Sequence, residues 1–155
     1  MDVYQKAQDL LGRRPHFTAE LRRKLQQRGY AAADIAMALD RLTDLGYLDD
    51  LTCARRLAEE LFRRRGYGRR VISGRLRQRG VDAAMAAVVV EELFAALEPG
   101  ELDDVFLRLW SRRRSRPPAA FCRYLYQRGF LTGEIEEFRR RRGRELGLDG
   151  GDCPE

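Results

Sequence analysis

Apolar residues recur along the chain at the spacing of an α-helix. One stripe follows the i, i+3, i+4, i+7 rule and comprises Ala54, Leu57, Ala58, Leu61 and Phe62. A second stripe has the same spacing and comprises Leu102, Val105, Phe106, Leu109 and Trp110. The sequence has no stretch with the sustained alternation of apolar and polar residues that is typical of a strand, so the pattern predicts an all-α fold.

A short motif, Leu-x-Gln-Arg-Gly followed by an apolar residue, occurs three times. Its glycines are Gly29, Gly80 and Gly129, which lie 51 and 49 residues apart. A fixed period of this size indicates tandem structural units. Because glycine readily adopts the left-handed conformation that ends a helix, each motif predicts the end of the second helix of a unit.

Further helical stripes flank each motif and complete three units of three helices. In the third unit, Ile135 and Phe138 are followed by the run Arg139 to Arg142, so its last helix is expected to be short or exposed. We predict three tandem three-helix repeats that form an elongated, curved helical array. Their bounds are residues 1–49, 50–99 and 100–146, with a flexible tail over residues 147–155.

The chain is basic, and almost all of its positive charge comes from arginine. It has 155 residues with 30 basic and 24 acidic side chains, and Lys6 and Lys24 are the only lysines. The planar guanidinium group matches phosphates and carboxylates, which favours a polyanionic partner such as a nucleic acid or an acidic protein surface. A base-composition bias of the genome is the alternative explanation.

Little in the sequence indicates catalysis, a metal or a cofactor. Asp49 and Asp50 precede a predicted helix, where carboxylates cap free N–H groups, and Thr18 is expected to cap another helix. The only histidine, His16, has no nucleophile motif nearby, and the three cysteines form no C-x-x-C pair. We therefore expect no enzyme, no metal and no cofactor. The absence of a long apolar run or a signal peptide favours a cytoplasmic protein that does not enter membranes.

Arginines gather in two fields that we take as candidate partner-binding or DNA-binding residues. The middle field comprises Arg63, Arg64, Arg65, Arg69, Arg70, Arg75 and Arg79, with Tyr67 among them, and Arg77 extends its basic surface. The later field comprises Arg112, Arg113, Arg114, Arg116, Arg123 and Arg128. The alternative is a solvated face on which these arginines pair with Glu59, Glu60, Glu91 and Glu92.

Aromatic side chains could add stacking or anchoring contacts to these fields. Trp110 lies in phase with Phe106 and is expected in the core. At least one of Tyr124 and Tyr126 should be exposed, and Tyr126 is taken as the candidate.

A longer motif lies where the first two units join. It reads Gly46-Tyr47-Leu48-Asp49-Asp50 and is followed by Arg65-Gly66-Tyr67-Gly68. The first unit contains Glu20-Leu21-Arg22-Arg23-Lys24-Leu25, and the third contains Tyr124-Leu125-Tyr126-Gln127-Arg128-Gly129-Phe130. In this order, the motifs resemble those of the RecX family of bacterial RecA regulators over nearly the whole chain. The arginine run after Phe138 and the glycine-rich tail depart from the family pattern.

The resemblance implies a protein that binds the RecA filament on single-stranded DNA, lying along its groove. It also implies inhibition of strand exchange, ATP hydrolysis and co-protease activity, and thus a restraint on recombination and the SOS response. We expect a monomer. The competing hypothesis is a protein that binds DNA directly through phosphate contacts, and an enzyme built on Asp49, Asp50 and His16 is the least favoured.

Overall fold

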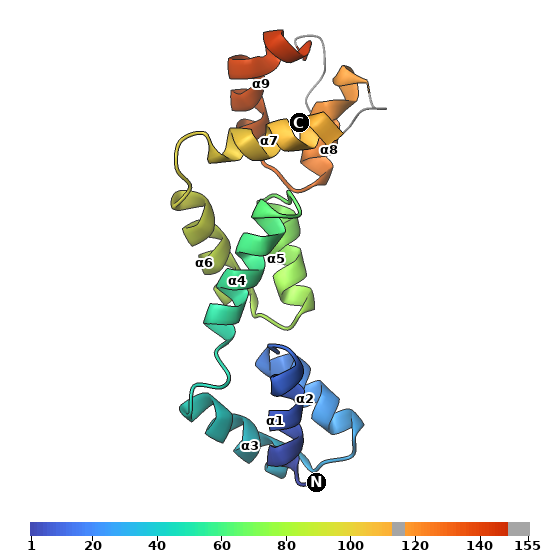
Figure 1. Ribbon diagram of the computed structural model, residues 1–155, viewed down its shortest axis with the longest axis vertical. Helices are drawn as coiled ribbons and strands as arrows, with labels where there is room; N and C mark the ends of the chain where they lie inside the picture. Colours follow the sequence, from blue (N-terminus) through green and yellow to red (C-terminus); the bar gives the residue numbers. More distant parts are fainter. Residues whose placement is uncertain (113–116, 149–155) are drawn as a thin grey trace. The chain divides into compact units, whose positions relative to one another are not determined.

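A computed structural model describes residues 1–112 and 117–148 of the chain (Figure 1). Within these ranges every regular element is a helix, which confirms the all-α prediction. The helices are α1 (Val3–Arg13), α2 (Thr18–Gln27), α3 (Ala32–Asp44), α4 (Asp50–Arg63), α5 (Arg69–Gln78), α6 (Ala83–Ala95), α7 (Glu101–Arg112), α8 (Phe121–Gln127) and α9 (Thr132–Leu146). A short 3₁₀ turn, η1 (Pro118–Ala120), leads into α8. No helix of the described ranges is long and apolar enough to cross a membrane.

The packing divides the chain into two compact units, unit 1 and unit 2, which are distinct from the three predicted three-helix repeats. Unit 1 comprises Met1–Leu57 and Arg75–Val89, and unit 2 comprises Ala58–Gly74 and Val90–Glu155. Helices α4, α5 and α6 therefore contribute residues to both units. The helices still follow one another in three groups of three, while the repeat bounds and the elongated, curved arrangement stay predictions.

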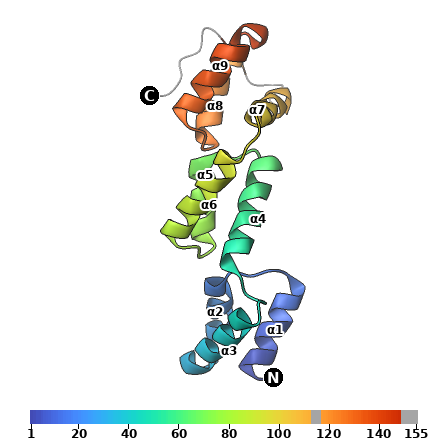
Figure 2. The ribbon, with the colours of Figure 1, turned by 90° about the vertical axis from the view of Figure 1, so that its left-hand side faces the viewer.

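The core of unit 1 is aliphatic. Helices α1, α2 and α3 contact one another (Figures 1 and 2), because each presents one apolar stripe to the other two. The buried cluster comprises Ala7, Leu10, Leu21, Leu25, Ile35, Leu39, Leu42 and Leu48. Burying each of the larger side chains stabilises the fold by about 1.5–3 kcal/mol relative to exposure.

The core of unit 2 is aromatic. The ring of Phe106 lies 4.6 Å from that of Phe130 and 5.1 Å from that of Phe138, both edge to face. This geometry joins α7 to the turn after α8 and to α9, and such pairs stabilise beyond their buried area. Trp110 lies 5.0 Å from Phe121 and is half-buried, so it packs on the core without being enclosed by it.

The helices that end at the three glycine motifs end with the same backbone conformation and hydrogen bond. Gly29, Gly80 and Gly129 have φ angles of 86°, 96° and 100°, which confirms the predicted left-handed ends. After each glycine, the next amide donates to the carbonyl of the motif's leucine, as Val81 N does to Leu76 O at 3.1 Å. This is the Schellman closure, and it satisfies carbonyls that the end of a helix leaves without a partner.

The start of α4 caps two helices. Asp49 accepts hydrogen bonds from the amide and hydroxyl of Thr52 and thus caps α4 itself. Asp50 accepts from the amide of Thr18 at 2.8 Å, at the start of α2. The prediction that Thr18 is a cap was wrong: Phe17 is the N-cap without a side-chain bond, and the Asp50 carboxylate substitutes for it.

The last helix is not short, which corrects the sequence-based expectation. Helix α9 has 15 residues because its arginines find acidic partners one turn away along the helix, as Arg141 does with Glu137 at 2.9 Å. The predicted tail also begins too early. Gly147 ends α9 in the left-handed conformation and Leu148 is buried, while residues 149–155 lie outside the described ranges.

Replacing Leu76 with Ala tests the buried stripe of α5. The Leu76 side chain is fully buried, so the substitution should lower the free energy of unfolding by about 2–5 kcal/mol. Denaturant unfolding followed by circular dichroism measures this loss. The matched change of the exposed neighbour Arg77 to Ala should cost less than about 0.5 kcal/mol. Equal losses in the two variants would contradict the burial of this stripe.

Candidate partner-binding surface

Each glycine motif places an arginine at the end of its helix, immediately before the glycine. These are Arg28 after α2, Arg79 after α5 and Arg128 after α8, and we call them the cap arginines. Two of them were taken as binding residues from the sequence. The structure gives both of these an internal role.

In unit 1, the end of α5 lies against the start of α2. The Arg79 guanidinium pairs with Glu20, which also binds Arg14 at 3.1 Å, and it lies over the ring of Phe17. Burial alone would raise the pKa of Glu20, but hydrogen bonds from Arg79 and Arg14 outweigh that effect and hold the pKa below its usual value. Arg79 therefore does not form a free stripe with Arg75.

Gly80 allows the same approach at the backbone level. A Cβ atom at Gly80 would lie 2.6 Å from Cβ of Ala19, far inside van der Waals contact. Glycine is thus required here for space as well as for its positive φ angle.

In unit 2, the end of α8 lies against the start of α5 (Figures 1 and 2). The amides of Gly68 and Arg70 donate to the carbonyls of Arg128 and Gly129 at 2.8 and 3.1 Å. The free N–H groups of one helix start thereby satisfy the free carbonyls of another helix end. A Cβ at Gly129 would lie 2.6 Å from the amide nitrogen of Val71, so this contact also requires glycine.

Side chains reinforce the junction in unit 2. Arg128 donates to the carbonyls of Arg65 and Gly66 and lies 4.3 Å from the centre of the Tyr67 ring. Arg70 donates to the carbonyl of Tyr126 and lies over its ring at 4.3 Å.

Both tyrosines of α8, Tyr124 and Tyr126, are half-buried, so the expectation that at least one is exposed was wrong. The arginines that stack on their rings cover them instead.

Two further candidate arginines form ion pairs within unit 2. Arg63 binds Glu59 at 2.9 Å and Glu101 at 2.7 Å. Arg69 binds Glu91 at 2.7 Å and lies over the ring of Phe94. For Arg63 and Arg69, the structure thus contains ion pairs of the kind that the alternative interpretation expects.

The remaining candidates of the two fields are exposed. They are Arg64, Arg65, Arg75, Arg112 and Arg123. Arg113, Arg114 and Arg116 lie outside the described residues. Neither Arg77 nor Arg123, on the second helices α5 and α8, makes an ion pair with another described residue.

Sequence reasoning missed two equivalent arginines on α2. Arg22 and Arg23 are exposed and, within the described ranges, also take part in no ion pair. The sequence carries a signal for Arg22, which has no acidic residue within a helical turn, but not for Arg23, because its neighbour Glu20 is seen to be occupied by Arg79 and Arg14 only in the structure. Exposed arginines that make no ion pair with a described residue thus lie on α2 (Arg22 and Arg23), α5 (Arg77) and α8 (Arg123).

His16 has a structural environment. Its Nδ1 lies 2.9 Å from the carbonyl of Arg14 and its Nε2 lies 2.8 Å from Nζ of Lys24, so we assign a neutral ring that donates from Nδ1 and accepts at Nε2. Burial is the main cause that lowers the pKa of His16 below its usual value of 6.5.

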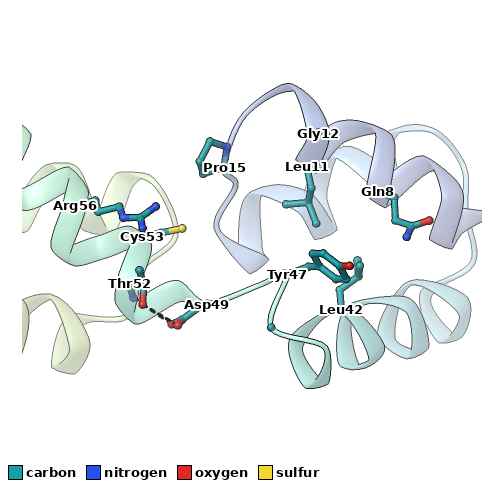
Figure 3. A pocket seen from close by; sticks show the side chains of 11 residues that line it. Gln8, Leu11, Gly12, Pro15, Leu42, Tyr47, Asp49, Thr52, Cys53 and Arg56 are labelled. Atoms are coloured by element: carbon teal, nitrogen blue, oxygen red, sulfur yellow. Dashed lines mark hydrogen bonds between the residues drawn. The ribbon is translucent and has the colours of Figure 1, made fainter.

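A pocket of about 560 Å³ in unit 1 lies beside the start of α4 (Figure 3). Tyr47, Cys53 and Arg56 line it together with apolar side chains of α1 and α3. Asp49 at its rim bonds to Thr52, and those bonds lower the pKa of Asp49. Burial raises the pKa of the Cys53 thiol, which makes it a poor nucleophile.

Comparison with protein families agrees with the order of the helices. Residues 4–42 match the family description "RecX, first three-helix domain", and residues 49–89 match "RecX, second three-helix domain". Together these regions cover more than half of the chain.

Relatives of similar length share a common description. The "Regulatory protein RecX" of Pseudomonas fluorescens strain SBW25 is 36% identical over 131 residues, covering 83% of each chain. That of Thermobifida fusca strain YX is 30% identical over 140 residues, covering 85% of this chain and 76% of the other. The crystal structure of RecX from Lactobacillus salivarius has the same fold, with a TM-score of 0.76 at 19% identity over 94% and 95% of the two chains.

Matched glycine substitutions test the junction in unit 1. Gly29 and Gly80 share the left-handed conformation, so alanine at either site should cost about 1–2 kcal/mol of unfolding free energy through backbone strain. At Gly80 the new Cβ must also displace Ala19, which should add at least about 1 kcal/mol. Denaturant unfolding of both variants gives the difference, and equal losses would contradict the close contact.

The pH dependence of stability tests the environment of His16. Because the folded chain holds the pKa of His16 below 6.5, the unfolded chain takes up the proton first. The stabilisation is therefore complete above pH 6.5 and is lost as the pH falls towards the folded pKa. The unfolding free energy should fall between about pH 7 and about pH 5, and more steeply than in a His16→Gln variant. Parallel curves for the two chains would show that His16 titrates normally.

Proposed function

The chain belongs to the RecX family of regulatory proteins, and we propose that it regulates RecA by binding the RecA filament on single-stranded DNA. Bound there, it restrains ATP hydrolysis, strand exchange and co-protease activity, and so tempers recombination and the SOS response. It acts in the cytoplasm as a monomer without a cofactor. Family membership supports RecA as the partner.

The observation that carries the binding mode is an exposed arginine on the second helix of each three-helix group. Arg22 and Arg23 on α2, Arg77 on α5 and Arg123 on α8 are exposed and make no ion pairs with other described residues. A guanidinium group without an internal partner gains most from an external carboxylate or phosphate, because it gives up no existing bond.

Repetition suits such a surface to a polymer. Each exposed ion pair contributes only about 0–1 kcal/mol, which is too little for specific binding by itself. When several equivalent helices engage successive subunits of a filament, each further contact becomes intramolecular and the affinities combine. A regulator built from repeats can thus discriminate the filament from a single subunit.

Direct DNA binding is the alternative, because the same guanidinium groups match phosphates. The two modes differ in their dependence on salt. Binding to single-stranded DNA through phosphates should lose affinity with a log–log slope of about −0.7 per phosphate contacted, whereas a protein interface should give a flatter dependence. Equal affinity for bare and RecA-coated DNA throughout a salt titration would favour the alternative.

A triple substitution tests the proposed surface. The variant with Arg23, Arg77 and Arg123 changed to Ala should need roughly tenfold more protein for half-maximal inhibition of RecA ATP hydrolysis on single-stranded DNA. Its folding should be unchanged, because these side chains are exposed. Inhibition by the natural chain well below one protein per RecA would indicate that it caps or breaks filaments.

The control removes the same charge from arginines that form ion pairs in the structure. Changing Arg13, Arg63 and Arg142 to Ala breaks pairs with Asp9, Glu59 and Glu145, among others, and should leave inhibition within about twofold of the natural chain. If both triple variants lose the same potency, net charge alone explains the binding. A folded natural chain that neither binds the filament nor alters ATP hydrolysis would overturn the proposed function.

A further inference from the structure

Two of the three cap arginines take part in the same kind of contact. At both junctions, a helix end with a cap arginine and a left-handed glycine receives the first turn of another helix. The guanidinium lies over an aromatic ring just before that helix, Phe17 for Arg79 and Tyr67 for Arg128. It also pairs with a nearby acceptor, which is the Glu20 carboxylate for Arg79 and backbone carbonyls for Arg128.

The end of α2 has the same cap arginine and left-handed glycine, and both are exposed to solvent. Gly29 has the same left-handed conformation, and the amide of Tyr30 closes the same motif on Leu25 O. Arg28 and Gly29 are both exposed, and no described atom lies within 4 Å of a Cβ built at Gly29. The Arg28 guanidinium donates at 3.0 Å to the carbonyl of Lys24, which belongs to its own helix.

We propose that the end of α2, formed by Arg28 and Gly29, receives the first turn of a helix of RecA. This rests on the proposed function, and it identifies the kind of element that the partner contributes. The partner helix should begin just after an aromatic residue, carry a small side chain where it meets Gly29, and offer a carboxylate or backbone carbonyl to Arg28.

Electrostatics favour a helix start over a phosphate at this position. A helix end carries partial negative charge on its free carbonyls, which repels a phosphate and attracts the N–H groups and positive dipole of a helix start. In unit 2 the carbonyls of Arg128 and Gly129 show this pairing directly, since they accept from two amides at the start of α5.

A second copy of this chain could offer the start of α3, whose N-cap Ala31 makes no side-chain hydrogen bond, so self-association is an outcome that the test must separate. Four other helix starts fit the end of α2 less well. The starts of α2 and α5 already receive helix ends within their own units. The start of η1 and α8 is formed by Pro117 and Pro118, which have no N–H to donate. The start of α7 holds Glu101, which pairs with Arg63.

Two substitutions test the proposal by different means. Arg28→Ala removes the guanidinium, and Gly29→Asn adds a side chain to the contact, because asparagine tolerates the left-handed conformation better than other residues. Each should weaken binding to RecA filaments on single-stranded DNA by about tenfold, since Arg28→Ala loses a charged hydrogen bond and Gly29→Asn obstructs the contact. Circular dichroism and unfolding should show both variants folded.

Matched controls separate this contact from general effects. Arg13→Ala removes an exposed charge elsewhere in unit 1, and Gly147→Asn introduces the same side chain at another open, left-handed helix end. Both should bind filaments as the natural chain does.

The outcomes are distinguishable. If the natural chain fails to bind filaments, the proposed function fails. If it binds and both α2-end variants bind equally well, this inference is wrong while the proposed function stands. If these variants instead change self-association in sedimentation experiments, the occupant is a second copy, which also overturns the inference. Loss of binding to bare single-stranded DNA in parallel would show that Arg28 contacts phosphate instead.

Discussion

The structure depends on how its second helices end. A left-handed glycine allows the closing hydrogen bonds of the helix, and the missing Cβ lets another helix start approach the same point. At Gly80 and Gly129 these two requirements coincide, because a side chain there would be strained and would also clash with Ala19 or Val71. The free carbonyls at the end of α8 and the free amides at the start of α5 then satisfy each other, and the Arg70 side chain adds a bond to the carbonyl of Tyr126.

The same constraint divides the arginines into two classes. Those at helix ends or near glutamates, such as Arg79 and Arg63, are committed to internal contacts. Those on the exposed faces of the second helices, such as Arg23 and Arg77, make no ion pair with a described residue, and on this ground we propose them for partner binding. Density of arginine along the sequence therefore does not identify a binding surface. An acidic residue one helical turn away accounts for the ion pair of Arg63 with Glu59, but it does not account for Arg79, whose partner Glu20 is distant in the sequence.

Most of the fold could be predicted from the sequence, because helical periodicity and glycine ends are local properties. The left-handed ends at Gly29, Gly80 and Gly129 follow from one motif. The length of α9 was missed, because hydrophobic periodicity does not register the ion pairs that stabilise an arginine-rich helix. The internal hydrogen bonds of Arg70, Arg79 and Arg128 could not be predicted, because their acceptors lie dozens of residues away in the chain.

The two ends of the series of second helices differ in a way that bears on assembly. Repeat proteins stack because each unit offers what its neighbour lacks, and they need distinct terminal units to stop. Here Pro117 lacks an N–H at the position where Gly68 donates before α5, whereas Ala119, at the position of Arg70, keeps its N–H. The start of η1 and α8 therefore cannot form both of the backbone bonds seen in unit 2. At the other end, Arg28 and Gly29 retain every feature that the two internal junctions use. Stacking on the start of η1 is thus weakened by one lost backbone bond, whereas the end of α2 remains available for a further contact.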